Sequence, residues 1–246
     1  MRVLVIPDIH LKTKKVDEIL KNESGGFDHA LFLGDYFDDF FDTVEMNRDT
    51  AEWVRERSQH SDKTLLKGNH DYSYYSSQFH TSNYYCSGYS YEKDLAINRV
   101  MGKAWNSLLD FAIIDEVLYT HAGLNNFFLN PSISNEDMLV RYLLDQCRAV
   151  NNWLKESKKT RCYPNCAESR LFRAGMNYYR GGDQERGGII WNDAREHEPV
   201  PFIKQIFGHT ISEEPVIYDN GDICLDTDLK HYAIVTNGVA EIKKVV

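Results

Sequence analysis

Residues 1–10 read MRVLVIPDIH, and the apolar, β-branched part of this stretch ends at Pro7. The composition predicts a buried strand over residues 3–6 that leads directly into a loop. Two later stretches, residues 30–35 and 63–69, repeat this pattern of a short apolar run stopped by a glycine and a polar residue. The polar residues at these three strand ends are Asp8, Asp35 and Asn69.

The segments between these strands are predicted helices. Residues 14–21 and 44–57 carry apolar side chains at helical spacing. A strand, a loop, a helix and a second strand in succession are typical of βαβ units with a parallel sheet. In such sheets ligand-binding groups collect beyond the carboxyl ends of the strands, so we expect the three polar residues to lie at one edge.

The second half of the chain mixes helices with hairpins. Helices are predicted over residues 94–110 and 135–156, and residues 111–114 and 117–120 are predicted to pair around a tight turn. The last quarter is predicted to be rich in β-structure, with Asn-Gly turns. Its strands are residues 203–207, 215–218, 223–226, 232–236 and 239–245. We expect one domain over residues 1–246, in which residues 125–198 form a helical or irregular insertion or lid.

Five short elements carry side chains that suit metal coordination, and each of them follows a predicted strand. They are Asp8-Ile9-His10, Gly34-Asp35, Gly68-Asn69-His70, His121-Ala122-Gly123 and Gly208-His209. Each element is weak evidence alone, because a lone histidine is commonly a hydrogen-bonded polar residue. Together they supply carboxylate, imidazole and amide groups, which bind manganese, iron, zinc or magnesium.

As an ordered set, and with the stretch Trp191-Asn192-Asp193, these motifs resemble the calcineurin-like metallophosphoesterases. They are most similar to the phage and bacterial protein serine/threonine phosphatases. The resemblance implies an α/β fold in which two mixed β-sheets pack as a sandwich flanked by helices. It also implies two divalent metal ions, with manganese the leading candidate and iron, zinc, nickel or magnesium as alternatives. The implied ligands are Asp8 and His10 for one ion, Asn69, His121 and His209 for the other, and Asp35 as the bridge.

The resemblance further implies an acid catalyst. His70 directly follows Asn69, so the turn that presents Asn69 to a metal presents His70 to the leaving-group side. Asp38 is placed to orient His70, and an imidazole bonded to a carboxylate stays protonated and can donate to a departing alkoxide. We therefore predict His70 as general acid and Asp38 as its partner. The alternative is that His70 only packs or binds substrate.

One departure from the family pattern concerns phosphate binding. The phosphatases continue with Arg-Gly after the aspartate at position 38, whereas this chain continues with the acidic and aromatic residues 39–42. The guanidinium group that would grip phosphate is missing there. Arg195 is the leading replacement because it closely follows the Trp191 stretch and because guanidinium matches phosphate in a bidentate way. Arg180, Arg186 and Lys67 are the alternatives.

These features predict a phosphomonoester hydrolase in which a metal-bridging hydroxide attacks phosphorus, with a phosphoprotein as the substrate implied by the resemblance. A second hypothesis is hydrolysis of a nucleotide or dinucleotide, such as a diadenosine polyphosphate or a cyclic nucleotide. The missing arginine and the tyrosine-rich residues 72–91 keep it open, since tyrosine rings can stack on a base. We favour packing beneath loops for these tyrosines. A non-catalytic scaffold is disfavoured, because every implied ligand is present.

Composition limits the remaining function classes. The 246 residues carry a net charge of −9, which argues against extended nucleic-acid binding but not against a phosphorylated substrate. The five cysteines are odd in number and scattered, which indicates a reduced, cytoplasmic chain, and Cys162 with Cys166 lacks the partners for a structural zinc site. The sequence contains no apolar stretch long enough to span a membrane, so we expect no membrane association.

Overall fold

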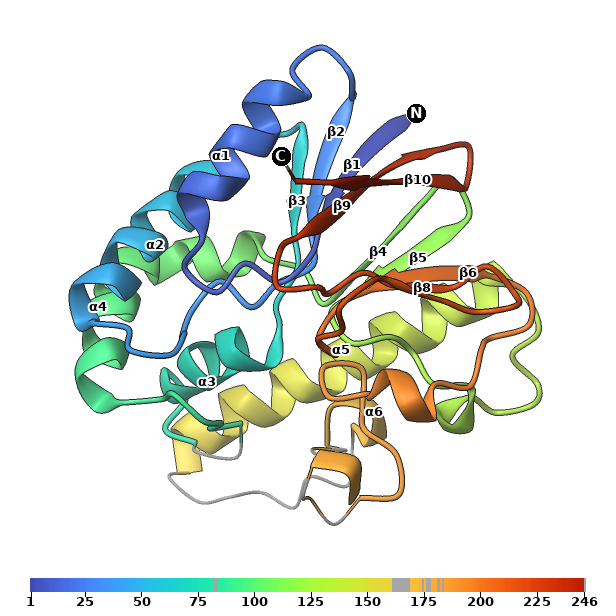
Figure 1. Cartoon of the computed structure of the whole chain (residues 1–246). Helices are drawn as coiled ribbons and strands as arrows, with labels where there is room; N and C mark the ends of the chain where they lie inside the picture. The colour runs from blue at the N-terminus through green and yellow to red at the C-terminus, as the bar shows by residue number, and fades with distance from the viewer. Residues whose placement is uncertain are drawn as a thin grey trace.

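Two mixed sheets of five strands each form the centre of the structure, and helices flank them (Figure 1). The computed structural model describes residues 1–81, 84–160, 169–173, 175, 178–180, 182 and 184–245. The predicted fold class, a sandwich of two mixed sheets flanked by helices, is confirmed.

The first sheet has the order β10-β9-β1-β2-β3. Its parallel strands are β1 (Arg2–Ile6), β2 (His29–Phe32) and β3 (Lys63–Leu65), joined by α1 (Thr13–Asn22) and α2 (Val44–Arg57). The hairpin of β9 (His231–Thr236) and β10 (Val239–Lys244) pairs antiparallel to β1. The three parallel strands therefore end at the same edge, as the βαβ pattern predicted.

The second sheet has the order β4-β5-β6-β8-β7. Its strands are β4 (Phe111–Ile114), β5 (Val117–Thr120), β6 (Lys204–Phe207), β7 (Val216–Ile217) and β8 (Ile223–Cys224). Strands β5, β6 and β8 are parallel, and β4 and β7 pair antiparallel at the two edges. This sheet also contributes parallel strand ends to one edge.

Successive side chains along a strand point to opposite faces of the sheet, and this divides the core into two layers. In β1, Val3 and Val5 pack between the two sheets with residues such as Tyr119 and Ile206 of the second sheet. Their neighbours Leu4 and Ile6 face the opposite side, where helices pack. Since side chains alternate across a strand, a continuous apolar run serves both faces of a covered sheet.

The helices differ from the predictions at two places. Helix α3 (Asn69–Ser77) was not predicted, because its tyrosines and serines show no apolar stripe and are buried nearly all round. The helix predicted over residues 94–110 ends early: α4 (Tyr91–Met101) stops where Gly102 turns to a φ of 45°, and the 3₁₀ helix η1 (Gly102–Ser107) follows. Glycine adopts such a φ without a steric penalty, so it ends the helix.

The remaining elements belong to the middle and late part of the chain. The long helix predicted over residues 135–156 is confirmed as α5 (Glu136–Thr160). The short helices are η2 (Asn126–Phe128), α6 (Arg170–Arg173), η4 (Tyr178–Arg180) and η5 (Ala194–Glu196). Cys162 and Cys166 lie outside the described residues. Within the described ranges, no helix combines the length and the apolar character that crossing a membrane would need.

Candidate active site

The polar residues singled out in the sequence meet where the parallel strands of both sheets end. Asp8 follows β1, Asp35 follows β2, and Asn69 opens α3 after β3. His121 follows β5 and His209 follows β6 in the second sheet. The fold thus brings residues from five distant segments to one edge of the sandwich.

Two groups of potential metal ligands form there, and they share one carboxylate. The ligand atoms of Asp8, His10 and Asp35 lie within 4.8 Å of one another. Those of Asp35, His121 and His209 do so as well. We call the first group the His10 cluster and the second the His121 cluster. Asp35 is therefore placed to contact a cation in either one.

The His121 cluster is rich in lone pairs and poor in protons. His121 Nε2 lies 2.9 Å from Asn69 Oδ1, 3.1 Å from His209 Nδ1 and 3.4 Å from Asp35 Oδ2. His121 Nδ1 donates to the Leu33 carbonyl at 3.0 Å, which leaves a lone pair on Nε2. His121 Nε2 and Asn69 Oδ1 then carry no proton, so only His209 or a protonated Asp35 can supply one among the four converging atoms. Such a set fits a cation, and the backbone bond to Nδ1 is the kind that orients a metal-binding histidine.

The His10 cluster is held by backbone contacts. His10 Nδ1 donates to the Asp38 carbonyl at 2.7 Å, which turns Nε2 to within 3.7 Å of Asp35 Oδ2. Both carboxylate oxygens of Asp8 accept from the backbone N–H of His209 at 3.0 Å. This bond ties the first sheet's ligand to the second sheet's loop. Two carboxylates and an imidazole again suit a divalent cation.

Burial shifts the titration of these groups in opposite directions. Burial, with neighbouring carboxylates, raises the pKa of Asp8 and of Asp35 well above its usual range. Burial lowers the pKa of His121 to about 3 and lowers that of His209 as well. The imidazoles are neutral and ready to bind metal, whereas the carboxylates need a cation to stay charged.

The backbone around these ligands is strained. His10, Asp35 and His209 have φ angles of 41°, 49° and 71°, in a region that favours glycine. At Gly68 a side chain would overlap the Asp35 carboxylate, and at Gly208 it would overlap the Asp8 carboxylate. Strain of this kind is concentrated at functional sites, where the surrounding structure holds it in place.

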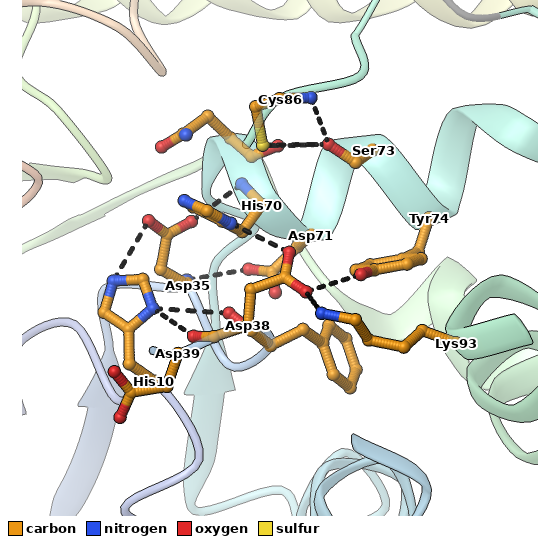
Figure 2. A network of polar contacts seen from close by, with 12 residues as sticks. His10, Asp35, Asp38, Asp39, His70, Asp71, Ser73, Tyr74, Cys86 and Lys93 are labelled. Atoms are coloured by element: carbon orange, nitrogen blue, oxygen red, sulfur yellow. Dashed lines mark hydrogen bonds and ion pairs between the residues drawn. The ribbon is translucent and has the colours of Figure 1, made fainter. Parts of the chain in front are cut away.

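His70 lies beside His10 and Asp35 and bonds to Asp38, the contact that the family resemblance implied (Figure 2). His70 Nδ1 is 2.9 Å from Asp38 Oδ2, and its ring meets the His10 ring edge-on at 5.2 Å. Burial raises the pKa of Asp38, but bonds from His70 and other donors outweigh burial and bring it below its usual value. Burial lowers the pKa of His70, and Asp38 offsets this only in part. The carboxylate alone therefore does not keep His70 protonated, contrary to our expectation.

The predicted phosphate-binding cations lie in different surroundings. Arg195 forms a bidentate ion pair with Asp193 of its own loop, at 2.8 and 2.9 Å, and its side chain is 58% exposed. Arg180 reaches from η4 to the His209 carbonyl at 3.1 Å and to Thr210 Oγ1 at 3.0 Å. Lys67 is buried against Asp110, and Arg186 pairs with Glu198. Of the four, Arg180 is the residue whose side chain donates a hydrogen bond to a predicted ligand residue, His209.

Three residues with roles at the site were not singled out in the sequence. Asp71 accepts from the backbone N–H groups of Gly68 and Asp35 at 2.8 Å, and so joins the second and third loops. Its place three residues after Gly68 is that of the acidic half of a capping box, but Gly68 has no side chain to complete the box, so the sequence signal is weak. Lys12 pairs with Asp39 and Lys93 with Asp42, so the two extra acidic residues of this loop are each matched by a lysine. Nothing local in the sequence marks these lysines.

The tyrosines after the third loop mostly pack in the core. Tyr72, Tyr74, Tyr75 and Tyr84 are buried, which confirms the packing interpretation for them. Tyr85 and Tyr89 differ, since their rings stack at 3.8 Å and Tyr85 is 39% exposed. A stacked pair at the surface leaves a face that a planar ligand can contact.

Comparison with known proteins gives a family. The calcineurin-like phosphoesterase family matches residues 1–225. A protein serine/threonine phosphatase from Saccharomyces cerevisiae has a similar structure, at a TM-score of 0.54 and 13% identity over 100% of this chain and 80% of that one. At a TM-score of 0.45, a structure described provisionally as a diadenosine tetraphosphatase shares 14% identity over 100% of this chain and 94% of its own. A metallophosphoesterase from Sphaerobacter thermophilus has a TM-score of 0.43 and 13% identity over 100% of this chain and 89% of its own. No curated protein sequence matches.

Proposed function

This chain belongs to the calcineurin-like phosphoesterase family, and from that premise we propose that it hydrolyses phosphomonoesters, with phosphoproteins as substrates, using two divalent metal ions. The observation that carries the proposal is that the His10 and His121 clusters share Asp35. Two neighbouring cations repel each other, and a shared carboxylate offsets that repulsion. The proposed ligands are the six residues Asp8, His10, Asp35, Asn69, His121 and His209.

Bound there, two metal ions would lower the pKa of a water molecule and offset the charge of the phosphate; manganese is our first candidate. The protein's own groups prepare the site for them. Leu33 fixes the His121 ring, and the Asp38 carbonyl fixes the His10 ring. The ligand atoms are thus oriented before binding, which reduces the entropy lost on binding.

His70 is proposed as the general acid on the leaving-group side. Because Nδ1 is bonded to Asp38, Nε2 is the nitrogen that can give a proton to the leaving oxygen. As the P–O bond breaks, that proton moves to the oxygen and the alcohol leaves with a neutral imidazole behind it. The pKa of His70 is lowered by burial, and a bound phosphate dianion would raise it again.

Arg180 and Arg195 are proposed to complete the phosphate site. Both are paired with Asp193, and Arg180 also contacts the carbonyl of His209. A guanidinium at that position adds positive charge beside the His121 cluster. We propose that this part of the 125–198 insertion covers the substrate, and that it replaces the arginine absent after Asp38.

A phosphoprotein suits the surface next to Asp38. Phe40 is 92% exposed and Phe41 fully exposed, and Val44 and Met46 are also exposed. Apolar side chains gathered on one exposed segment favour contact with another protein. The stacked Tyr85 and Tyr89 favour the second candidate, a nucleotide or dinucleotide.

A four-substrate assay tests both candidates. The protein is stripped with a chelator, reloaded with manganese, and assayed with para-nitrophenyl phosphate, its bis ester, a phosphoserine peptide and diadenosine tetraphosphate. We expect activity to depend on added metal and to include the monoester and the peptide. Turnover confined to the dinucleotide would replace the phosphoprotein proposal, and metal-independent turnover would reject the site.

A further inference from the structure

The Asp38 carboxylate is held by a lysine from a distant helix. Lys93 lies in α4, and its Nζ is 2.7 Å from Asp38 Oδ1 and 2.7 Å from Asp42 Oδ2 (Figure 2). The lysine side chain is 9% exposed. A lysine is rarely buried unless it is paired, so its ion pairs with the two carboxylates account for the burial of Lys93.

The two oxygens of Asp38 have different partners. Oδ1 accepts from Lys93 Nζ at 2.7 Å and from the Tyr74 hydroxyl at 2.5 Å. Oδ2 accepts from His70 Nδ1 at 2.9 Å. With both donors on Oδ1, rotation of the carboxylate is blocked, and Oδ2 stays directed at His70.

The pocket around Asp38 leaves it little room to move. Gly88 has a φ of +91°, and a Cβ atom there would lie 2.8 Å from Asp38 Cγ. Asp38 N–H donates to Asn47 Oδ1 at 3.1 Å, and Asn47 in turn donates to Asp42 at 2.7 Å. Backbone, glycine loop and lysine therefore confine the carboxylate from three sides.

We propose that Lys93 is a positioning residue for proton donation by His70. It acts through Asp38: by holding Oδ1, it keeps Oδ2 against His70 Nδ1 and so aims Nε2 at the leaving group. The inference rests on the proposed function, because it needs His70 to donate a proton. If His70 is wrongly oriented, the rate of hydrolysis falls most for those esters whose leaving group must be protonated in order to depart.

The test therefore compares leaving groups. The double variant Lys93→Met/Asp42→Asn removes one cation and one anion, so the pocket keeps its net charge while Oδ1 loses a donor. We expect kcat for a phosphoserine peptide, whose alkoxide is a poor leaving group, to fall by about 10–100-fold. For para-nitrophenyl phosphate we expect a much smaller loss, with KM little changed for both. Tyr74→Phe, which removes the other donor to Oδ1, should show the same selectivity more weakly.

Two variants serve as controls. Asp42→Asn alone leaves Lys93 on Asp38 and should keep the ratio of the two activities near that of the wild type. Lys243→Met breaks a similar arrangement outside the Asp38 pocket, where Glu23 accepts from Lys243 at 2.9 Å and from Tyr232 at 2.6 Å. That variant should lower thermal stability without changing the activity ratio. Thermal unfolding and metal content of every variant show whether it is folded and loaded.

His70→Gln distinguishes a failure of the proposed function from a failure of the positioning role of Lys93. An inactive, metal-loaded wild type would reject the proposed function itself. If the wild type is active and His70→Gln loses the peptide selectively, but the folded Lys93 double variant does not, the positioning role is wrong. Equal losses on both substrates in the folded double variant would also reject it. A matching selective loss in both variants supports the inference.

Discussion

The His10 cluster and the His121 cluster share Asp35 but differ in how far they open to solvent. The His10 side chain is 27% exposed, whereas that of His121 is completely buried and His209 is buried as well. Water does not compete with a buried neutral imidazole for a cation, whereas it does compete with an exposed imidazole. If the proposed two-metal site is correct, we expect an ion at the His121 cluster to be held more tightly than an ion at the His10 cluster.

Asp35→Asn gives the largest expected effect, because it removes the member that the clusters share. Losing one charge weakens the attraction for both ions and leaves their repulsion unrelieved. We expect kcat to fall by about 10³-fold or more, the scale of losing an essential transition-state stabiliser. Metal content by mass spectrometry and kcat are measured together. A variant that keeps both ions and its activity would contradict the bridging role.

A matched pair, His209→Gln and His10→Gln, tests the difference between the clusters. His209→Gln removes a buried ligand, so we expect about a 10²–10³-fold loss of kcat that added manganese does not restore. His10→Gln alters the exposed side, and we expect about a 10–100-fold loss that excess manganese partly restores. Activity is titrated against free manganese for both. Equal losses with equal rescue would show that the exposure difference does not govern metal affinity.

The smallest expected effect is the pH dependence of metal stabilisation. In the metal-free chain the pKa values of Asp8 and Asp35 are raised, so the folded state keeps protons that the unfolded chain releases. Through these two carboxylates alone, rising pH above their usual pKa of 3.8 destabilises the metal-free fold, up to the raised values. His121 and His209 act in the opposite direction, because their pKa values are lowered by burial and, below about pH 6.5, the unfolded chain takes up protons that the folded imidazoles do not. Neither imidazole holds a proton that a metal would have to expel in this range.

Metal binding must expel the carboxylate protons, so metal should stabilise the protein more at about pH 8 than at about pH 5. At a hundredfold excess over Kd, one ion contributes about 2.7 kcal/mol. Thermal unfolding with and without manganese measures the difference at each pH. A difference that shrinks as pH rises would contradict the assignment of Asp8 and Asp35.

Much of the fold could be predicted because local patterns decide it. The apolar runs of β1, β2 and β3 are stopped by glycine or proline, and the Asn237-Gly238 turn joins β9 and β10 in left-handed φ angles of 51° and 72°. Helix α3 could not be predicted, because it is buried nearly all round and has no apolar stripe. The extent of α4 was misjudged, because the apolar residues beyond Gly102 continue in a 3₁₀ helix.

The sequence by itself determined the parts of the site that local order controls: the strand ends and the polar residues placed on them. The pairing of His70 with Asp38 came from the family resemblance. Only the tertiary structure decided how Asp35 is shared, how unequal in exposure the two clusters are, and which cation meets Asp38. These depend on where distant segments meet. Lys93 lies 55 residues from Asp38 along the chain, yet its Nζ is bonded to the carboxylate, because α4 packs against α2, the helix that follows the loop of Asp38. No spacing in the sequence encodes such a contact, since it arises from the packing of whole helices and loops.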